Sequence, residues 1–260
     1  MLAAYLRPST IDAARHARAV LRLLVRALRA AWPEVRITIR ADSGFCRWRL
    51  MRWCDSHGIG YVLGLARNPA LQRDARAEIA RAERQFQATS PPQRLFGSFG
   101  YAAGSWDRSR RVIVKAEPNA QGANPRFIVT NVPGDPQRLY DEVSCQRGAM
   151  ENRIKEQQLD RVADRTSGPQ FLANQFRLLW SSAAYVLVQT LRRTALAGTE
   201  RARAQVGTIR LRLFKVAARV VVRARRVVFH LASSYPYQEV FRAVYAQLVE
   251  PRVVPAVGGG

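Results

Sequence analysis

The chain has 260 residues, of which 42 are Lys or Arg and 19 are Asp or Glu, so it carries a formal net charge of +23. Its apolar content of 48% excludes disorder driven by composition, and a chain of this length buries a core without needing disulfide bonds. The basic excess favours nucleic acid as the partner, because Lys and Arg neutralise phosphates. Ribosome-like RNA binding and binding to a membrane surface are the alternatives that charge leaves open.

Three cysteines, Cys46, Cys54 and Cys145, have no CxxC spacing, and the chain has only three histidines, which argues against a structural zinc site. Neither the N-terminal residues nor the apolar stretch Phe171–Leu191 has the uninterrupted apolar run of a signal peptide or a membrane span. We therefore expect a protein of the reducing cytoplasm that has no membrane partner.

The first predicted elements are a helix over Ile11–Ala31, capped by Ser9 or Thr10, and a strand over Glu34–Ala41. The helix is indicated by apolar residues at helical spacing and the strand by alternation with β-branched residues. The strand runs directly into Asp42, which is followed by Ser43-Gly44. The pattern therefore predicts an acidic side chain at the carboxyl end of a strand.

A short helix over Arg47–Ser56 and a second strand over Gly60–Leu65 follow, so the order of elements predicts an α/β sheet with parallel neighbouring strands. Arg73–Gln85 is predicted to be an exposed helix. Beyond Thr89 the chain contains short apolar runs at Arg111–Lys115 and Arg126–Thr130, separated by turn residues. This pattern is typical of hairpins and predicts an antiparallel insertion in the α/β core.

The last part of the chain returns to helical patterns. Residues 138–160 are predicted to be helical, and Phe171–Leu196 to be a largely buried helix. Arg201–Arg226 carries nine basic residues and no acid. The resulting division is 1–93 and 134–200 for the two parts of the core, 94–133 for the insertion and 201–260 for a helical, basic C-terminal region.

Two acids are the candidate catalytic residues, and each also has an ordinary structural explanation. Asp42 is placed where sites form in open α/β sheets, although an Asp at a strand end is more often a turn or helix cap. Glu151 lies four residues from both Arg147 and Lys155, a spacing that usually gives a solvated ladder of ion pairs on a helix.

Several motifs in order resemble the DDE transposases of bacterial insertion sequences, over roughly residues 1 to 250. They are ITIRADSGF, YVLGLARN, RGAMENRIKE, ADRTS and NQFRLLWSSAAYVL. The resemblance implies an α/β fold with an RNase H-like core. It also implies a β insertion between the second catalytic Asp and the catalytic Glu, whose helix has a tyrosine, arginine, glutamate, lysine signature in this subgroup.

Carried over by position, Asp42 matches the second catalytic Asp, Glu151 the catalytic Glu and Arg147 the signature arginine. The tyrosine of the signature is replaced by Ser144 and its lysine by Gln158. The residues expected to bind DNA are basic residues near Glu151 and in the C-terminal region: Arg147, Arg153, Lys155, Arg210, Arg212 and Lys215.

The family's reaction explains these residue types, because carboxylates are the hard oxygen ligands that Mg²⁺ prefers. The resemblance implies Mg²⁺ or Mn²⁺ held by Asp42 and Glu151, two ions about 3.5–4 Å apart, and DNA strand cleavage and transfer. Duplex DNA, as element ends and target, is the implied partner, bound by a dimer, and the implied location is the bacterial nucleoid.

A third acid is harder to find, because the family's first catalytic Asp lies upstream of the matching segment. Before Asp42 the chain has only Asp12, at a predicted helix start, and Glu34, at the opposite end of the strand. We therefore expect an N-terminally truncated transposase without its first core strands, partial in its RNase H-like core and inactive alone. The alternatives are a non-catalytic DNA-binding remnant and an unrelated basic RNA-binding protein.

Overall fold

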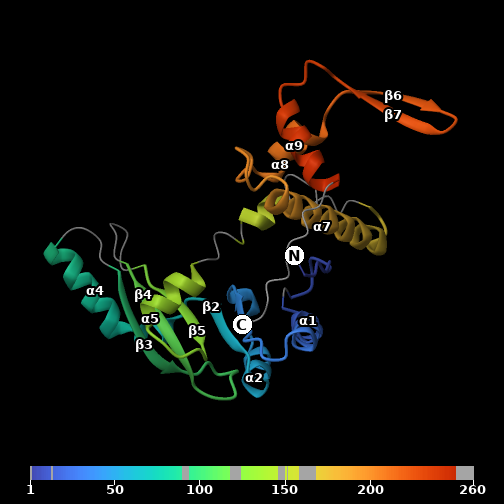
Figure 1. Ribbon diagram of the computed structural model, residues 1–260. Helices are drawn as coiled ribbons and strands as arrows, with labels where there is room; N and C mark the ends of the chain where they lie inside the picture. Colours follow the sequence, from blue (N-terminus) through green and yellow to red (C-terminus); the bar gives the residue numbers. More distant parts are fainter. Residues whose placement is uncertain are drawn as a thin grey trace. The chain divides into compact units, whose positions relative to one another are not determined.

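The computed structural model describes residues 2–12, 14–89, 94–117, 124–145, 150, 152–157 and 168–249. The chain divides into two compact units: Arg7–Met150 forms one, and Met1–Leu6 with Glu151–Gly260 forms the other. Figure 1 shows the elements of both units. The division at residues 94, 134 and 201 stays a prediction.

The Arg7–Met150 unit is built on a five-stranded sheet with the order β1-β2-β5-β4-β3. β1 is parallel to β2, and the other neighbouring strands are antiparallel. The strands are β1 (Thr38–Ala41), β2 (Gly60–Leu65), β3 (Leu95–Tyr101), β4 (Arg110–Ala116) and β5 (Arg126–Thr130). The predicted parallel pair is therefore present, and the predicted antiparallel strands continue the same sheet.

Helices connect these strands, in part with other limits than the sequence predicts. They are α1 (Ala17–Ala31), η1 (Ser43–Phe45), α2 (Trp48–Ser56), α3 (Pro69–Asp74), α4 (Arg76–Thr89), α5 (Pro136–Arg138) and the π-helix η2 (Leu139–Ser144). The helix predicted over Arg73–Gln85 is divided at Ala75. Gly58, with φ +60°, follows the end of α2 in the left-handed conformation that glycine favours.

The predicted start of the first helix is wrong. α1 begins at Ala17, directly after His16, whose φ of 67° is left-handed and does not continue a helix backwards. Ser9 and Thr10 therefore do not cap α1. Asp12 instead accepts a hydrogen bond from the N–H of Ala14, at 2.7 Å, within the turn before the helix.

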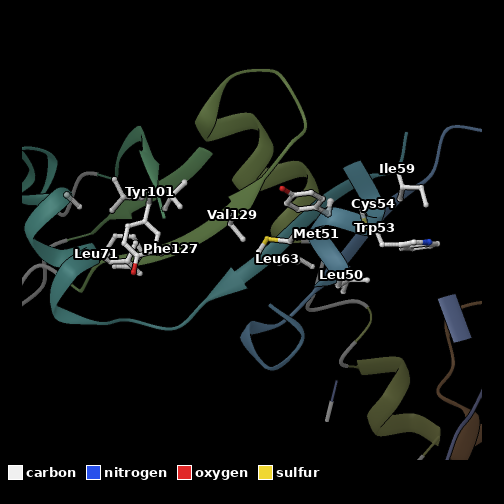
Figure 2. Close-up of a cluster of buried hydrophobic side chains, with 14 of the residues drawn as sticks. Leu50, Met51, Trp53, Cys54, Ile59, Leu63, Leu71, Tyr101, Phe127 and Val129 are labelled. Carbon is white, nitrogen blue, oxygen red and sulfur yellow. The ribbon is translucent and has the colours of Figure 1, made fainter. Parts of the chain in front are cut away.

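The main core lies on one face of the sheet, where alternate strand residues point toward the helices (Figure 2). Leu63 of β2 lies beside Met51 and Leu50 of α2, and Phe127 of β5 lies near Leu71 of α3. Because side chains alternate between the faces of a strand, this packing fixes which residues of β2 face the helices.

The opposite face of the same sheet is covered by η2. Val62, Ile113 and Ile128, from three neighbouring strands, form a second buried cluster with Leu139 and Tyr140 of η2. The chain segment that precedes Cys145 is thus packed against the middle of the sheet. This packing brings η2, which is far from β2 in the sequence, close to that strand.

The second unit is mainly helical around α7. Its elements are helical residues 152–157, α7 (Phe171–Thr194), α8 (Val206–Ile209), the π-helix η3 (Arg210–Phe214), β6 (Ala218–Arg223), β7 (Arg226–Leu231) and α9 (Gln238–Val249). Tyr185 and Val188 of α7 pack with Val206, Ile209 and Val244 in its core. A core of helix faces therefore holds this unit together.

The expectation that Phe171–Leu196 is largely buried is wrong for this unit. α7 buries Tyr185 and Val188, whereas Leu172, Trp180 and Leu187 have exposed fractions of 63–78%. The reason is that, among the described residues of this unit, the neighbouring helices pack against one side of α7. Among the described residues, no helix is long and apolar enough to span a membrane.

The sequence analysis predicted a helical C-terminal region, and this prediction is wrong in part. β6 and β7 form an antiparallel hairpin that projects from the helices of its unit (Figure 1). Five valines and Phe229 lie in these strands, and β-branched and aromatic residues favour extended backbone. The predicted basic tail is therefore in part a β-ribbon.

Candidate active site

Asp42 lies directly after β1, at the carboxyl end of the strand, as the sequence predicts. Its Oδ1 accepts a hydrogen bond from the N–H of Gly44, at 2.9 Å, and caps η1. The side chain is exposed to solvent. The residue is thus both a helix cap and an accessible carboxylate at the edge where sites form in α/β sheets.

Gly64 of β2 allows the chain to turn at Asp42. A Cβ added to Gly64 would lie 3.0 Å from the amide nitrogen of Ser43 and 3.3 Å from the carbonyl carbon of Asp42. These atoms belong to the backbone, which moves less readily than the end of a side chain. The glycine of the YVLGLARN motif therefore sets how closely β2 approaches the candidate catalytic residue.

Arg40 connects β1 to the segment that leads toward Arg147 and Glu151. Its guanidinium donates a hydrogen bond of 2.8 Å to the carbonyl of Val143, at the end of η2. Arg40 lies two residues before Asp42, so the bond joins the candidate Asp strand to the residues just upstream of the signature. Sequence reasoning missed this contact because its partners are 103 residues apart.

Arg147 and Glu151, like the signature position Gln158, lie outside the described residues. The proximity of Asp42 and Glu151 therefore stays a prediction. The residues that follow Glu151 are described and belong to the second unit.

Residues 152–157 are attached to α7 by side-chain hydrogen bonds from three of their positions. Gln157 donates to Ser182 at 2.9 Å, and the hydroxyl of Tyr185 donates to Glu156 at 3.1 Å. Arg153, a predicted DNA-binding residue, donates to Gln189 at 3.1 Å. Since positions 153, 156 and 157 share one side of a helix, this side is held by α7.

Lys155 is not part of that contact. It is exposed, in contrast to the buried Gln157 two residues later. Its ammonium group is therefore accessible to a phosphate, as the DNA-binding prediction requires.

Glu156 is the residue of this segment that sequence reasoning missed. Its side chain is 14% exposed and accepts hydrogen bonds from Gln189, from Arg192 and from the backbone N–H of Val206, in addition to Tyr185. Burial, and then the bond to this carboxylate, raises the pKa of Tyr185. Glu156 thus joins the segment after Glu151 to α7 and α8. In the sequence, Glu156 is one acid in a long polar run, and such a run is typical of a solvent-exposed helix face.

Asp12 has a partner of its own. Its carboxylate lies 2.6 Å from the guanidinium of Arg47, and this hydrogen bond lowers its pKa. Asp12 and Arg47 line a cleft of about 500 Å³ together with the start of α1, Phe45 and residues 48–50. The prediction that Asp12 is a structural acid therefore has a contact to support it.

The predicted C-terminal DNA contacts lie on η3 and just after it. Arg212 and Lys215 are exposed, and Arg210 is half-buried. The guanidinium of Arg212 lies 5.2 Å from the ring centre of Tyr237 in a cation–π contact. These three positions are thus not equivalent as candidates for phosphate contact.

The described residues contain no group of three or more His, Cys, Asp or Glu side chains able to hold a metal ion. The chemistry of Asp42 nonetheless suits a hard divalent cation, because an exposed carboxylate provides oxygen ligands. Cys46, Cys54 and Cys145 are free thiols.

A mixed α/β sheet with an accessible acid at a strand end is compatible with the nuclease fold of the DDE enzymes. The chain belongs to the DDE transposases, because the family model for the transposase DDE domain, group 1, matches residues 1–253. This confirms the resemblance of the motifs to DDE transposases. The family implies DNA as substrate and transposition as the process. No curated protein matches the sequence.

Proposed function

We propose that this transposase carries out metal-dependent cleavage and transfer of DNA strands, with Asp42 and Glu151 as two of its catalytic carboxylates. The observation that carries the proposal is the hydrogen bond between Arg40 and Val143. It anchors the residues upstream of Glu151 to the strand that ends at Asp42, although the two acids are far apart in sequence. Membership of the transposase DDE family supports the proposed reaction class.

Asp42 and Glu151 are the side chains that would hold Mg²⁺ or Mn²⁺. When bound, two such ions activate the attacking water or 3′-hydroxyl and stabilise the leaving oxygen. The residues of the chain position this site: Gly44 orients the Asp42 carboxylate, Gly64 admits the turn, and Glu156 fixes the helical segment after Glu151.

Basic side chains near the signature would hold the DNA backbone. Lys155 has the exposure needed for a phosphate contact, and Arg147 occupies the signature position. We further propose that a dimer assembles on the element ends in the bacterial nucleoid. In this arrangement the carboxylates bind metal, and the basic side chains bind phosphate.

We expect the 260-residue chain by itself to bind duplex DNA without cutting it. The two acids before Asp42 in sequence are not free to complete the site: Asp12 pairs with Arg47, and Glu34 precedes β1 at its other end. A non-catalytic DNA-binding protein is the second candidate function. It is favoured by the use of the Asp42 carboxylate as a cap for η1.

The test is a nicking assay on supercoiled plasmid in Mg²⁺ or Mn²⁺. It compares the 260-residue chain, the protein translated with the in-frame codons upstream of Met1, and that longer protein with Asp42→Asn. We expect binding alone from the first, nicking from the second and loss of nicking in the third. Equal nicking with Asp42→Asn would contradict the catalytic assignment.

A separate measurement tests the metal ligands without turnover. Titration of Mn²⁺ followed by electron paramagnetic resonance should show weaker binding after Asp42→Asn or Glu151→Gln. Glu83→Gln, an exposed acid on α4, is the matched control and should leave binding unchanged. Identical titrations for all four proteins would favour the non-catalytic candidate.

A further inference from the structure

The β6–β7 hairpin, here called the ribbon (Ala218–Leu231), has two chemically different faces. The antiparallel register pairs Arg219 with His230 and Arg223 with Arg226, and side chains alternate between faces along each strand. These four residues therefore lie on one face, with Val221 and Val228 between them. The opposite face carries apolar side chains only: Ala218, Val220, Val222, Val227, Phe229 and Leu231.

The arginines of the basic face are not neutralised by acidic side chains among the described residues. Within the part of the chain that the structure describes, Arg219, Arg223 and Arg226 form no ion pair, and all three are exposed. The two-residue turn adds Arg225 at the tip. No acid occurs in the sequence from Arg201 to Gln238. The ribbon thus presents unpaired positive charge at its end and along one side.

One cross-strand pair of arginines destabilises the hairpin. Arg223 and Arg226 are direct cross-strand partners next to the turn. Like charges placed opposite each other destabilise a strand pair, and the repulsion is relieved when an anion binds between them. This placement is therefore more useful for binding a polyanion than for folding.

The dimensions of the ribbon suit the major groove of DNA. Arg219 and Arg223 are four residues apart on one strand, which is about 13 Å at 3.3 Å per residue. The major groove of B-DNA is about 12 Å wide and admits a two-stranded ribbon. The two ends of the basic face therefore match the separation of the phosphate backbones that border the groove.

We propose that the ribbon is a DNA-binding arm that lies across the major groove, with Arg219, Arg223 and Arg226 on phosphates and Arg225 at its leading end. This inference rests on the proposed function for the identity of the nucleic acid. It adds a binding element separate from Asp42 and Glu151. It also explains why the hairpin projects from its unit instead of packing into it (Figure 1).

The test measures affinity for a duplex over a range of salt, by fluorescence anisotropy with the whole chain. The ribbon variant carries Arg219→Gln, Arg223→Gln and Arg226→Gln. Each lost phosphate contact makes the log–log salt slope shallower by about 0.9, so we expect a change of about 2.7 for duplex DNA. A variant with Lys at the same three positions should keep the slope.

The matched control removes the same charge from exposed arginines of α3 and α4, with Arg73→Gln, Arg76→Gln and Arg81→Gln. Its slope on duplex DNA should change by less than half as much. Duplex RNA of the same sequence is the second control, because its deep, narrow major groove does not admit the ribbon. On RNA the ribbon variant should match the unaltered protein.

Folding is followed in parallel by thermal unfolding. The ribbon variant should melt at the same temperature as the unaltered protein or higher, since the repulsion between Arg223 and Arg226 is removed. An unchanged DNA slope, or equal losses in the ribbon variant and the α3–α4 control, would overturn the proposal. Equal losses on DNA and RNA would show charge attraction without groove binding, which also overturns it.

The same assays separate this proposal from the proposed function. In the longer protein translated with the codons upstream of Met1, Asp42→Asn should abolish metal-dependent nicking, and in the 260-residue chain it should leave the salt slope unchanged. A normal slope change in the ribbon variant combined with no effect of Asp42→Asn would leave the arm standing and remove the catalytic assignment. Binding of the ribbon face to anionic lipid vesicles but not to DNA would overturn the proposal that DNA is its partner.

Discussion

Gly64 of β2 lies so close to the turn at Asp42 that an added Cβ would be 3.0 Å from the amide nitrogen of Ser43 and 3.3 Å from the carbonyl carbon of Asp42. The backbones of the parallel strands β1 and β2 are thus in close contact where the candidate catalytic acid caps η1. The glycine and the acid belong to different motifs of the sequence, and the fold makes them neighbours.

Gly64→Ala should disturb this turn. The extra methyl group has to displace backbone, and overpacking of this kind costs roughly 1–3 kcal/mol of unfolding free energy. Urea denaturation measures the loss. Gly104→Ala is the control, because a Cβ there has nothing within 4 Å, and its midpoint should not fall. Similar behaviour of the two variants would show that β2 adjusts freely beneath Asp42.

Arg40→Met should loosen the segment that precedes Arg147. It leaves the Val143 carbonyl without its donor, at a cost of about 1 kcal/mol in unfolding free energy. If this bond positions the site, Mn²⁺ affinity should fall as well. Arg36→Met, at an exposed position just before β1, is the control and should change neither quantity. Weaker folding with normal Mn²⁺ binding would restrict Arg40 to a structural role.

Glu156→Gln should destabilise the second unit. The carboxylate accepts hydrogen bonds from Tyr185, Arg192 and the N–H of Val206, and the amide cannot replace all of them. We expect a loss of roughly 1–3 kcal/mol in unfolding free energy, measured by urea denaturation.

The control for this change is Glu200→Gln, which removes an acid that is 66% exposed and pairs with Arg201 at 2.8 Å. Exposed ion pairs contribute about 0–1 kcal/mol, so the control should be nearly neutral. If both variants lose the same stability, Glu156 does not anchor the segment after Glu151.

The thiols should differ in reactivity toward iodoacetamide. Burial raises the pKa of Cys46 to about 11 and that of Cys54 to about 12, so very little thiolate forms at pH 8. Cys145 is exposed and should be the thiol that reacts first. Mass spectrometry after timed alkylation checks the order. Labelling of Cys46 should accelerate as pH rises toward its pKa, and fast labelling of Cys54 at pH 8 would contradict its burial.

The sequence by itself determined the local elements with strong periodicity and the family. Asp42 after β1, the strand at Gly60–Leu65 and the long helix α7 were all predictable, because alternation and helical spacing are local properties. The ordered motifs led to the DDE transposases, which the family match confirms.

The ribbon was missed for a physical reason. Its turn is Ala224-Arg225 and lacks the Asn-Gly or Asp-Gly pair that marks a two-residue hairpin in sequence. The arginines around the turn favoured an interpretation based on charge, although the runs Val220–Val222 and Val227–Val228 have the β-branched residues typical of strands. Only the pairing of β6 with β7 decides that Arg223 and Arg226 share a face.

Tertiary structure alone decided the remaining contacts. The roles of Gly64, Arg40 and Glu156 arise from partners on other elements, at separations that no local pattern records. The predicted buried helix at α7 failed for the same reason, since apolar composition does not specify which sides of a helix receive neighbours. Local backbone preference selects strands and helices, whereas long-range packing selects the side chains that meet.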